Sequence, residues 1–276
     1  MRTSITPRSA ARSHRTHGTT MAIGWHRQSE GEHYMATPFI DHYHSNGRIL
    51  DDTWRARPNI YESRLRLLHR ALVDRNPGKI LSIGIGSGIF ETLLNKRYDI
   101  TVAEAVEPSE SLGAEARRKG LAVTQSTAQD YDYAGAPYDT IVYNGSSFGF
   151  IPDDEIEGVF TRNRDALSER GRLVLTDVPA ESALGIILQT LQRYDVPRED
   201  FAELLSGTSF FNIDTHSYKP NWHPIPWYAD LLTRIGFGEL RFYQTVLANP
   251  LYQKDQVEDP IEGYTKGNYV AIVAEK

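Results

Sequence analysis

Residues 79–91, which read KILSIGIGSGIFE, constrain the fold of this chain more than any other stretch. Their first part is a short apolar run, typical of a strand buried on both faces of a parallel sheet. Three glycines follow at alternate positions, and their missing Cβ atoms allow a tight turn whose backbone can touch a ligand. A helix predicted directly after them would offer unpaired N–H groups to an oxygen-rich ligand. The stretch therefore predicts a nucleotide-type binding site at Gly84, Gly86 and Gly88.

The spacing of these glycines distinguishes two kinds of nucleotide site. A dinucleotide fingerprint reads G-x-G-x-x-G, and its third glycine would fall on Ile89. The chain instead reads G-x-G-x-G, and Glu107 follows 19 positions after Gly88. Glu107 closes a strand-like run over residues 100–107. The spacing of the glycines therefore argues against a dinucleotide site.

The order of the later elements indicates an α/β fold. Strand-like and helical runs alternate after Glu107, at residues 121–124, 138–144, 153–168 and 171–177. This alternation predicts a parallel, doubly wound sheet. Near the end of the chain, a helical segment at 227–235 and a glycine break precede two adjacent strand-like runs, 239–247 and 268–275.

In this combination the glycine run resembles motif I of the class I S-adenosylmethionine-dependent methyltransferases, and the resemblance extends over residues 77–276. It implies an α/β fold with a doubly wound, seven-stranded, mostly parallel sheet whose last strand is antiparallel. It also implies an enzyme that uses S-adenosyl-L-methionine as its cofactor. In this family an acid that ends the second strand, here Glu107, accepts hydrogen bonds from both ribose hydroxyls. Small-molecule members of the family carry a cover before motif I, so we expect an N-terminal cover and an insertion after strand five.

Three parts are predicted along the chain. Residues 1–32 are rich in arginine, serine and threonine, a composition that also occurs in transit peptides, but they lack the apolar core of a secretory signal. We expect a disordered tail or an upstream extension of the reading frame. Residues 33–76 combine an aromatic and histidine cluster with helical periodicity, and form the expected helical cover. Residues 77–276 form the expected S-adenosylmethionine-binding domain, with a substrate-side insertion at 178–227.

The resemblance also implies which residues bind the cofactor. Besides the three glycines and the acid after the second strand, these are Asn144 at the end of the fourth strand and either Gln129 or Asp130 near the adenine. The family usually has an acid two residues before the first glycine, where this chain has Ser82. A water-mediated contact with the methionine amino group therefore has to come from elsewhere, for example from backbone carbonyls near Gly84.

Candidates for the substrate pocket lie before motif I and in the insertion. By the same resemblance, these substrate-binding residues are Tyr43, Trp54, Tyr61, Tyr218 and His223. Core packing is the alternative role for the aromatic residues before motif I. Enclosing a sulfonium or a cationic amine by cation–π attraction is the functional role.

Two residues are candidate catalytic groups. Tyr143 ends the fourth strand, and His216 belongs to a Thr-His-Ser-Tyr run that resembles the segment crossing the pocket mouth in small-molecule methyltransferases. Methyl transfer from a sulfonium is an in-line displacement that depends mainly on alignment of the reactants. A base helps when the acceptor is a hydroxyl or a protonated amine. The acceptor atom, N, O, S or C, stays open, and a structural role is the alternative for any of the histidines.

Composition limits the partners. The formal net charge of −6 argues against a broad nucleic-acid surface. The chain has no cysteine, which excludes a disulfide scaffold, a thiolate metal site and a cysteine nucleophile. No apolar run reaches the roughly 18 to 20 residues of a membrane-spanning helix. We expect no metal site, because His42 and His44 have no matching carboxylate cluster nearby.

Together these features predict a cytoplasmic enzyme that acts on a small molecule, binds neither nucleic acid nor membrane, and is compatible with a homodimer. Two other functions stay open. A nicotinamide-dependent oxidoreductase is disfavoured by Ile89 and by the adjacent last strands. A non-catalytic S-adenosylmethionine-binding scaffold is suggested by Ser82 in place of the usual acid.

Overall fold

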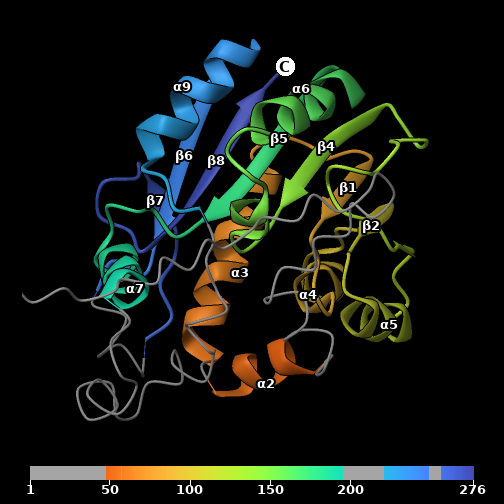
Figure 1. Cartoon of the computed structure of the whole chain (residues 1–276). Helices are drawn as coiled ribbons and strands as arrows, with labels where there is room; N and C mark the ends of the chain where they lie inside the picture. Colours follow the sequence, from red (N-terminus) through yellow and green to blue (C-terminus); the bar gives the residue numbers. More distant parts are fainter. Residues whose placement is uncertain (1–47, 57, 195–220, 249–255) are drawn as a thin grey trace, which may run out of the picture. The chain divides into compact units, whose positions relative to one another are not determined.

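The computed structural model describes residues 48–56, 58–194, 221–248 and 256–276, and Figure 1 shows how their helices and strands are arranged. These residues all belong to one unit of the chain, residues 36–276. An eight-stranded sheet runs through the unit in the order β3-β2-β1-β4-β5-β8-β6-β7. Helices cover both faces of this sheet (Figure 1).

The strands are β1 (Ile80–Ile83), β2 (Glu104–Val106), β3 (Val123–Thr124), β4 (Tyr138–Tyr143), β5 (Leu167–Asp177), β6 (Leu240–Thr245), β7 (Ile261–Glu262) and β8 (Tyr269–Glu275). The helices of the described ranges are α2 (Ile49–Ala56), α3 (Pro58–Val73), α4 (Ile89–Tyr98), α5 (Glu110–Arg118), α6 (Ile156–Ala166), α7 (Ala183–Tyr194) and α9 (Ile225–Ile235), with a 3-10 turn at Ser147–Phe150. The strands and helices predicted from the sequence are present, with shifted ends.

The first five strands are parallel wherever they pair. β1 lies between β2 and β4, so that Ser82 is opposite Ala105 on one side and Val142 on the other. β8 is antiparallel to both β5 and β6. Because parallel strands end at the same edge of a sheet, the carboxyl ends of β1, β2, β4 and β5 lie together, and the β4 and β5 arrowheads point to that edge in Figure 1. Ligands of open α/β sheets bind beyond this edge.

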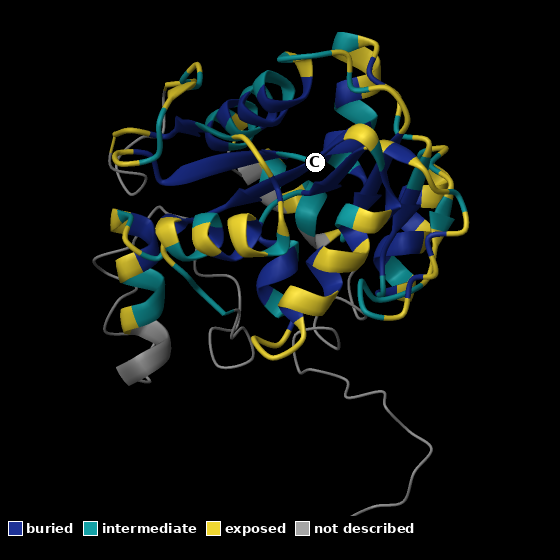
Figure 2. Cartoon of the chain, turned by 90° about the horizontal axis from the view of Figure 1, so that it is seen from above, coloured by how far each residue is buried: buried dark blue, intermediate teal, exposed yellow. Residues whose placement is uncertain are grey.

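An apolar layer on each face of the sheet holds the helices. Leu81 and Ile141 belong to the layer that includes residues of α6 and α9, whereas Ile80 and Val142 belong to the layer that includes residues of α3 and α4. Neighbouring residues of one strand therefore serve opposite layers. Figure 2 shows the result, with buried strands inside and the exposed residues on the outer sides of the helices.

The sheet has one strand more than the seven predicted. β7 is two residues long and pairs antiparallel with β6, where Gln244 is opposite Ile261. It forms within the long loop that the sequence predicts between the last two strands. The Gln244 side chain donates to the carbonyl of Glu262 and accepts from the N–H groups of Lys266 and Gly267, which fastens the loop to the sheet edge. The predicted antiparallel last strand is confirmed, since β8 runs against its neighbours.

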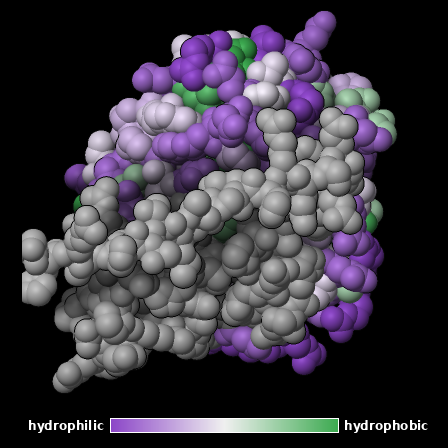
Figure 3. Space-filling view, in the orientation of Figure 1, coloured by the Kyte–Doolittle hydropathy of each residue, from purple (hydrophilic) through white to green (hydrophobic). Residues whose placement is uncertain are grey.

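The surface drawn in Figure 3 is mostly hydrophilic where the residues are described, with small apolar patches. Few large apolar side chains of these ranges are exposed, among them Val73 and Ile186. None of the described helices is long and apolar enough to cross a membrane.

A buried arginine attaches the C-terminal end of α3 to the sheet. Arg172 of β5 is fully buried, and its guanidinium donates to the backbone carbonyls of Leu72 and Arg75. Carbonyls at the end of a helix have no partner within the helix, so this guanidinium supplies one. The other end of α3 consequently lies at the carboxyl edge of the sheet, where it can contribute to a site.

Replacing this arginine tests the attachment. Arg172→Met should lower the free energy of unfolding by about 2–4 kcal/mol, because the buried carbonyl of Leu72 and the half-buried carbonyl of Arg75 lose their donor. Arg170→Met, an exposed position on the same strand, should change it by less than about 0.5 kcal/mol. Urea unfolding followed by circular dichroism measures both, and equal effects of the two substitutions would contradict the role of Arg172.

Candidate functional site

The loop between β1 and α4 turns sharply at the carboxyl edge of the sheet. Gly84, Gly86 and Gly88 have positive φ angles of 72°, 59° and 69°, a conformation that strains residues with a side chain. A Cβ on Gly84 would collide with Ser147, and one on Gly86 would collide with Leu50. We call residues 84–88 the glycine loop. Its bare backbone faces the turn after β4 on one side and α2 on the other.

Glu107, the first residue after β2, holds the glycine loop to the neighbouring strand. Its carboxylate accepts hydrogen bonds from the N–H groups of Gly86 (2.7 Å) and Ser109 (2.9 Å). Burial raises the pKa of Glu107 to about 7, although both hydrogen bonds favour the ionised form. The structure therefore brings the predicted acid into direct contact with the predicted glycines.

Helix α2 lies over the glycine loop. Asp51 of this helix accepts a hydrogen bond from the Ser87 hydroxyl (2.6 Å) and forms an ion pair with Lys119 (2.8 Å), which follows α5. Lys119 also donates to the backbone carbonyl of Ser87 (2.9 Å). These contacts tie α2, the loop and the end of α5 together, so α2 covers the loop.

A second buried acid lies beside the loop, next to the position where the family usually has its acid. The Ser82 hydroxyl donates to the carboxylate of Glu91 (2.9 Å), which belongs to the first turn of α4. Glu91 is 2% exposed, and burial raises its pKa to about 7. The sequence motifs did not point to this residue. Its signal is an acid three positions before the buried Leu94, on the side of α4 that faces the sheet.

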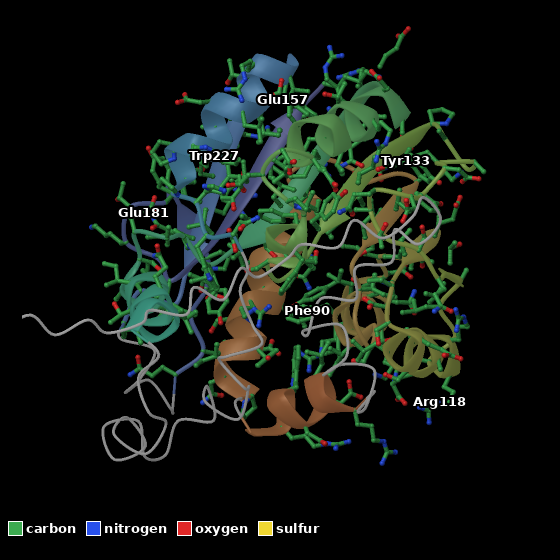
Figure 4. All side chains as sticks on the ribbon, viewed as in Figure 1. Phe90, Arg118, Tyr133, Glu157, Glu181 and Trp227 are labelled. Atoms are coloured by element: carbon green, nitrogen blue, oxygen red, sulfur yellow. The ribbon has the colours of Figure 1, made fainter. Side chains whose placement is uncertain are left out.

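Trp54 and Tyr61, both predicted to bind substrate, pack together beside α4. Their ring centroids are 5.2 Å apart, and Trp54 is also 5.2 Å from Phe90, which Figure 4 labels next to α3. The Arg64 guanidinium lies over the rings of Tyr61 (4.7 Å) and Phe90 (5.2 Å). These rings therefore hold a cation of the protein itself.

The carboxyl ends of β4 and β5 are joined through polar side chains. Asn144, predicted to bind cofactor, accepts a hydrogen bond at Oδ1 from the Thr176 hydroxyl (2.8 Å), which in turn accepts from the N–H of Gly145 (2.7 Å). Asp177 ends β5 and accepts from the N–H of Val178 (2.7 Å). Burial raises the pKa of Asp177 to about 7. Asn144 thus lies at the same edge as the glycine loop.

Tyr143, predicted as a catalytic group, lies in the core instead. Its hydroxyl accepts a hydrogen bond from Nδ2 of Asn163 in α6 (2.9 Å), and its ring packs against Phe148 and Phe160. Burial raises the pKa of this hydroxyl well above its usual value. Tyr143 shares a face of β4 with Ile141, which is why it enters the layer with α6 and α9. We do not retain Tyr143 as a catalytic residue.

Gln129 and Asp130, the two candidates for the adenine end, lie in the loop between β3 and β4. Gln129 is half-buried and donates to the carboxylate of Glu155 just before α6 (3.0 Å). Asp130 is exposed and accepts from the Thr127 hydroxyl (2.7 Å). Their described hydrogen-bond partners are thus Glu155 for the side chain of Gln129 and Thr127 for Asp130, and these do not distinguish the two candidates.

His223, predicted to bind substrate, lies just before α9. Its Nε2 is 2.9 Å from a carboxylate oxygen of Asp153, and its ring stacks on Trp227 with centroids 3.7 Å apart. Figure 4 labels Trp227 on α9. The N–H of Asn221 donates to the carbonyl of Gly149 (2.7 Å), so this segment is fixed to the turn after β4. The sequence analysis missed Asp153, which orients the histidine ring.

Tyr43, His216 and Tyr218 lie outside the described residues, so their predicted roles stay predictions. The same holds for the predicted tail at residues 1–32. Within the described ranges, no three His, Asp or Glu side chains gather as ligands for a metal ion.

A family model described as a methyltransferase domain matches residues 54–215, which is more than half of the chain. The matched stretch contains the glycine loop, Glu107 and the ends of β4 and β5. The chain belongs to this methyltransferase domain family. The predicted enzyme class is therefore confirmed. No curated protein matches the chain.

Solved structures with the same fold cover most of this methyltransferase. A Thermotoga maritima protein described as a possible histamine N-methyltransferase has a TM-score of 0.67 at 22% identity, over 86% of this chain and 99% of that chain. DhpI, bound to S-adenosylhomocysteine, has a TM-score of 0.56 at 14% identity over 86% and 94%. The plantazolicin methyltransferase BpumL, bound to the same ligand, has a TM-score of 0.54 at 13% identity, over 87% of this chain and 91% of that chain. The predicted class I fold is confirmed.

Three buried carboxyl groups at one sheet edge should make the stability of the ligand-free methyltransferase depend on pH. The pKa values of Glu91, Glu107 and Asp177 are about 7, above those of the unfolded chain. Between the unfolded and folded pKa, such a group binds more protons in the folded state, so it destabilises the fold progressively as pH rises. For one such group the free energy of unfolding should fall by about 2 kcal/mol from pH 5.5 to pH 8.

Asp177→Asn should reduce this fall by that amount, because an amide stays neutral at both pH values. Urea unfolding at pH 5.5 and pH 8 measures it. Asp139→Asn is the control. Hydrogen bonds from the N–H of Lys79 and the Ser168 hydroxyl lower the pKa of Asp139, so its contribution is complete above pH 5.5 and is lost only at lower pH. An Asp177→Asn variant that keeps the wild-type slope would contradict the argument.

Proposed function

We propose that this methyltransferase transfers a methyl group from S-adenosylmethionine to an N, O, S or C atom of a small molecule, by in-line displacement in a covered pocket. The observation that carries the proposal is the contact between Glu107 and the glycine loop, at the carboxyl ends of parallel strands. The bound cofactor supplies a methyl group that is activated by positively charged sulfur. The protein's tasks are to align the reactants, exclude water and accept a proton where the acceptor carries one.

The residues at the glycine loop suit an S-adenosyl ligand. The loop presents backbone where a Cβ would fill the space. The Glu107 carboxylate stands at the end of β2, where a ribose would meet it, and hydroxyl donors would favour its ionised form. Glu91 is buried, and its Oε2 accepts no hydrogen bond from another described residue. The site thus offers three kinds of polar group to the ligand. These are the backbone of the glycine loop, the Glu107 carboxylate as an acceptor for ribose hydroxyls, and Oε2 of Glu91.

The same proposal assigns the rest of the cofactor site. Gly84, Gly86 and Gly88 line the ligand with their backbone. Asn144 lies beside them at the end of β4, and either Gln129 or Asp130 meets the adenine. Similar structures bound to S-adenosylhomocysteine support an S-adenosyl ligand for this chain.

The substrate side lies between the two covers of the sheet edge. The segment at 33–76 supplies Trp54 and Tyr61, and the insertion at 178–227 supplies His223. In the pair with Asp153, Nε2 of the imidazole faces the carboxylate, and an imidazole has a second nitrogen that can donate or accept a proton. We assign the pair to substrate binding, with His223 able to accept a proton from the acceptor.

The remaining assignments concern residues outside the described ranges and the surroundings of the enzyme. His216 stays the candidate base of the insertion, with Tyr218 and Tyr43 as neighbours of the substrate. A small-molecule acceptor is supported by the kind of enzyme among the similar structures, which include a plantazolicin methyltransferase. A cytoplasmic location, a homodimer and the absence of nucleic-acid binding stay predictions.

Cofactor binding can be tested by isothermal titration with S-adenosylhomocysteine. The wild type should bind it, and Glu107→Ala should weaken binding at least about tenfold, because a charge-assisted pair of hydrogen bonds is lost. Glu104 begins β2, which Glu107 follows, and it bonds to the hydroxyls of Tyr131 and Tyr138. Glu104→Ala should therefore leave the affinity within about twofold of the wild type.

Circular dichroism has to show both variants folded for this comparison. No binding of S-adenosylhomocysteine by the wild type, together with binding of a reduced nicotinamide cofactor in a fluorescence titration, would replace the proposal by an oxidoreductase. Equal affinity of Glu107→Ala and the wild type would remove Glu107 from the site.

The substrate side can be tested with cofactor labelled on its methyl group. Label should pass to a member of a panel of small amines and phenols that includes histamine, or to a small molecule in extracts of the native host. His223→Ala should then raise KM for that acceptor at least about tenfold, while the affinity for S-adenosylhomocysteine stays unchanged. Cofactor binding without transfer to any acceptor would favour the scaffold function. Loss of cofactor affinity in His223→Ala would contradict a substrate-side role.

A further inference from the structure

We infer that Glu91 binds the α-ammonium group at the amino-acid end of the cofactor, from helix α4 instead of from strand β1. This inference rests on the proposed S-adenosylmethionine site and assigns one residue within it. It starts from a polar contact that the proposed function leaves unexplained, the hydrogen bond between Ser82 and Glu91 (2.9 Å).

Glu91 has one carboxylate oxygen to spare. Ser82 occupies Oε1, and Oε2 accepts no hydrogen bond from any other residue of the described ranges although it is buried. A buried carboxylate without a cation is costly, because the charged form loses its hydration. Such a group either stays protonated or meets a cation. The raised pKa of Glu91 agrees with the first state for the ligand-free protein.

No described cation of the protein satisfies this carboxylate. Lys119 is near enough for its charge to favour the ionised form of Glu91. Its ammonium is nevertheless bound to Asp51 (2.8 Å) and to the backbone carbonyl of Ser87 (2.9 Å). Lys119 forms no ion pair with Glu91, so the cation that completes the pair has to come from a ligand.

The position of Glu91 selects the part of the ligand. It lies in the first turn of α4, directly after the glycine loop, and its charge acts on Glu107 across that loop. Glu107 is the proposed partner of the ribose. An S-adenosyl ligand has its amino-acid end on the other side of the ribose from the adenine. That end carries an ammonium and a carboxylate, and only the ammonium is attracted to an acid.

The sequence context explains why the acid is on the helix. Ser82 and Glu91 approach each other because the glycine loop folds the start of α4 back against β1, on the side of the sheet that α4 covers. A serine on the strand leaves room for the longer side chain from the helix. The Ser82 hydroxyl then orients the Glu91 carboxylate. Ser82 carries no carboxylate of its own.

Isothermal titration with two ligands tests the inference. S-adenosylhomocysteine has the amino-acid end, and 5′-methylthioadenosine lacks it. Glu91→Gln should weaken binding of S-adenosylhomocysteine at least about tenfold and change the affinity for 5′-methylthioadenosine by less than about twofold. Glu104→Gln makes the same substitution at the start of β2, away from Glu107 at its end, and should change the affinity for neither ligand. A merely structural role would weaken both ligands alike.

A second variant moves the acid to strand β1. Ser82→Asp combined with Glu91→Gln should recover most of the affinity for S-adenosylhomocysteine. Thermal melting should show that Glu91→Gln and the double variant are both folded. Unchanged or tighter binding of S-adenosylhomocysteine by Glu91→Gln would overturn the inference, as would equal losses for both ligands. A wild type that binds neither ligand would instead overturn the proposed cofactor site, so the two failures are distinguishable.

Discussion

The site depends on how the chain leaves β1. It has to turn from a buried strand into α4 within a few residues, and left-handed glycines make that turn without side chains that would fill the ligand's space. The turn is then held from outside. Glu107 bonds to the N–H of Gly86 from β2, and Lys119 bonds to the carbonyl of Ser87 from the end of α5. The loop is therefore preorganised by its neighbours.

The same edge concentrates buried acids. Glu91, Glu107 and Asp177 lie at or near the carboxyl ends of strands, and burial raises the pKa of each to about 7. Perturbed carboxyl groups gathered in one place are typical of functional sites. In the ligand-free protein they reduce stability as they ionise. Hydroxyl donors and a cation from a ligand would reverse this, so ligand binding and stability are coupled at this edge.

The sequence predicted what depends on local patterns and missed what depends on side-chain direction. The buried strands followed from apolar runs, and the glycine loop with an acid at the end of the next strand followed from the glycine spacing and the family resemblance. Tyr143 was assigned to the pocket because it ends a strand, but both faces of β4 are covered and its side chain enters the layer under α6. Glu91 and Arg64 were missed because Glu91 bonds to Ser82 of β1, and Arg64 contacts the rings of Phe90 in α4 and Tyr269 in β8. The sequence of the short β7 contains no apolar run that would predict a strand.

In the proposed binding mode, the carboxyl edge between β1 and β2 holds the ribose of the cofactor at Glu107 and its amino-acid end at Glu91. A crystal structure of the full chain with S-adenosylhomocysteine is the decisive measurement. We expect both ribose hydroxyls within hydrogen-bonding distance of the Glu107 carboxylate, and the α-ammonium bound to Glu91 directly or through one water. A ligand bound elsewhere, or one whose amino-acid end points away from Glu91, would refute this binding mode.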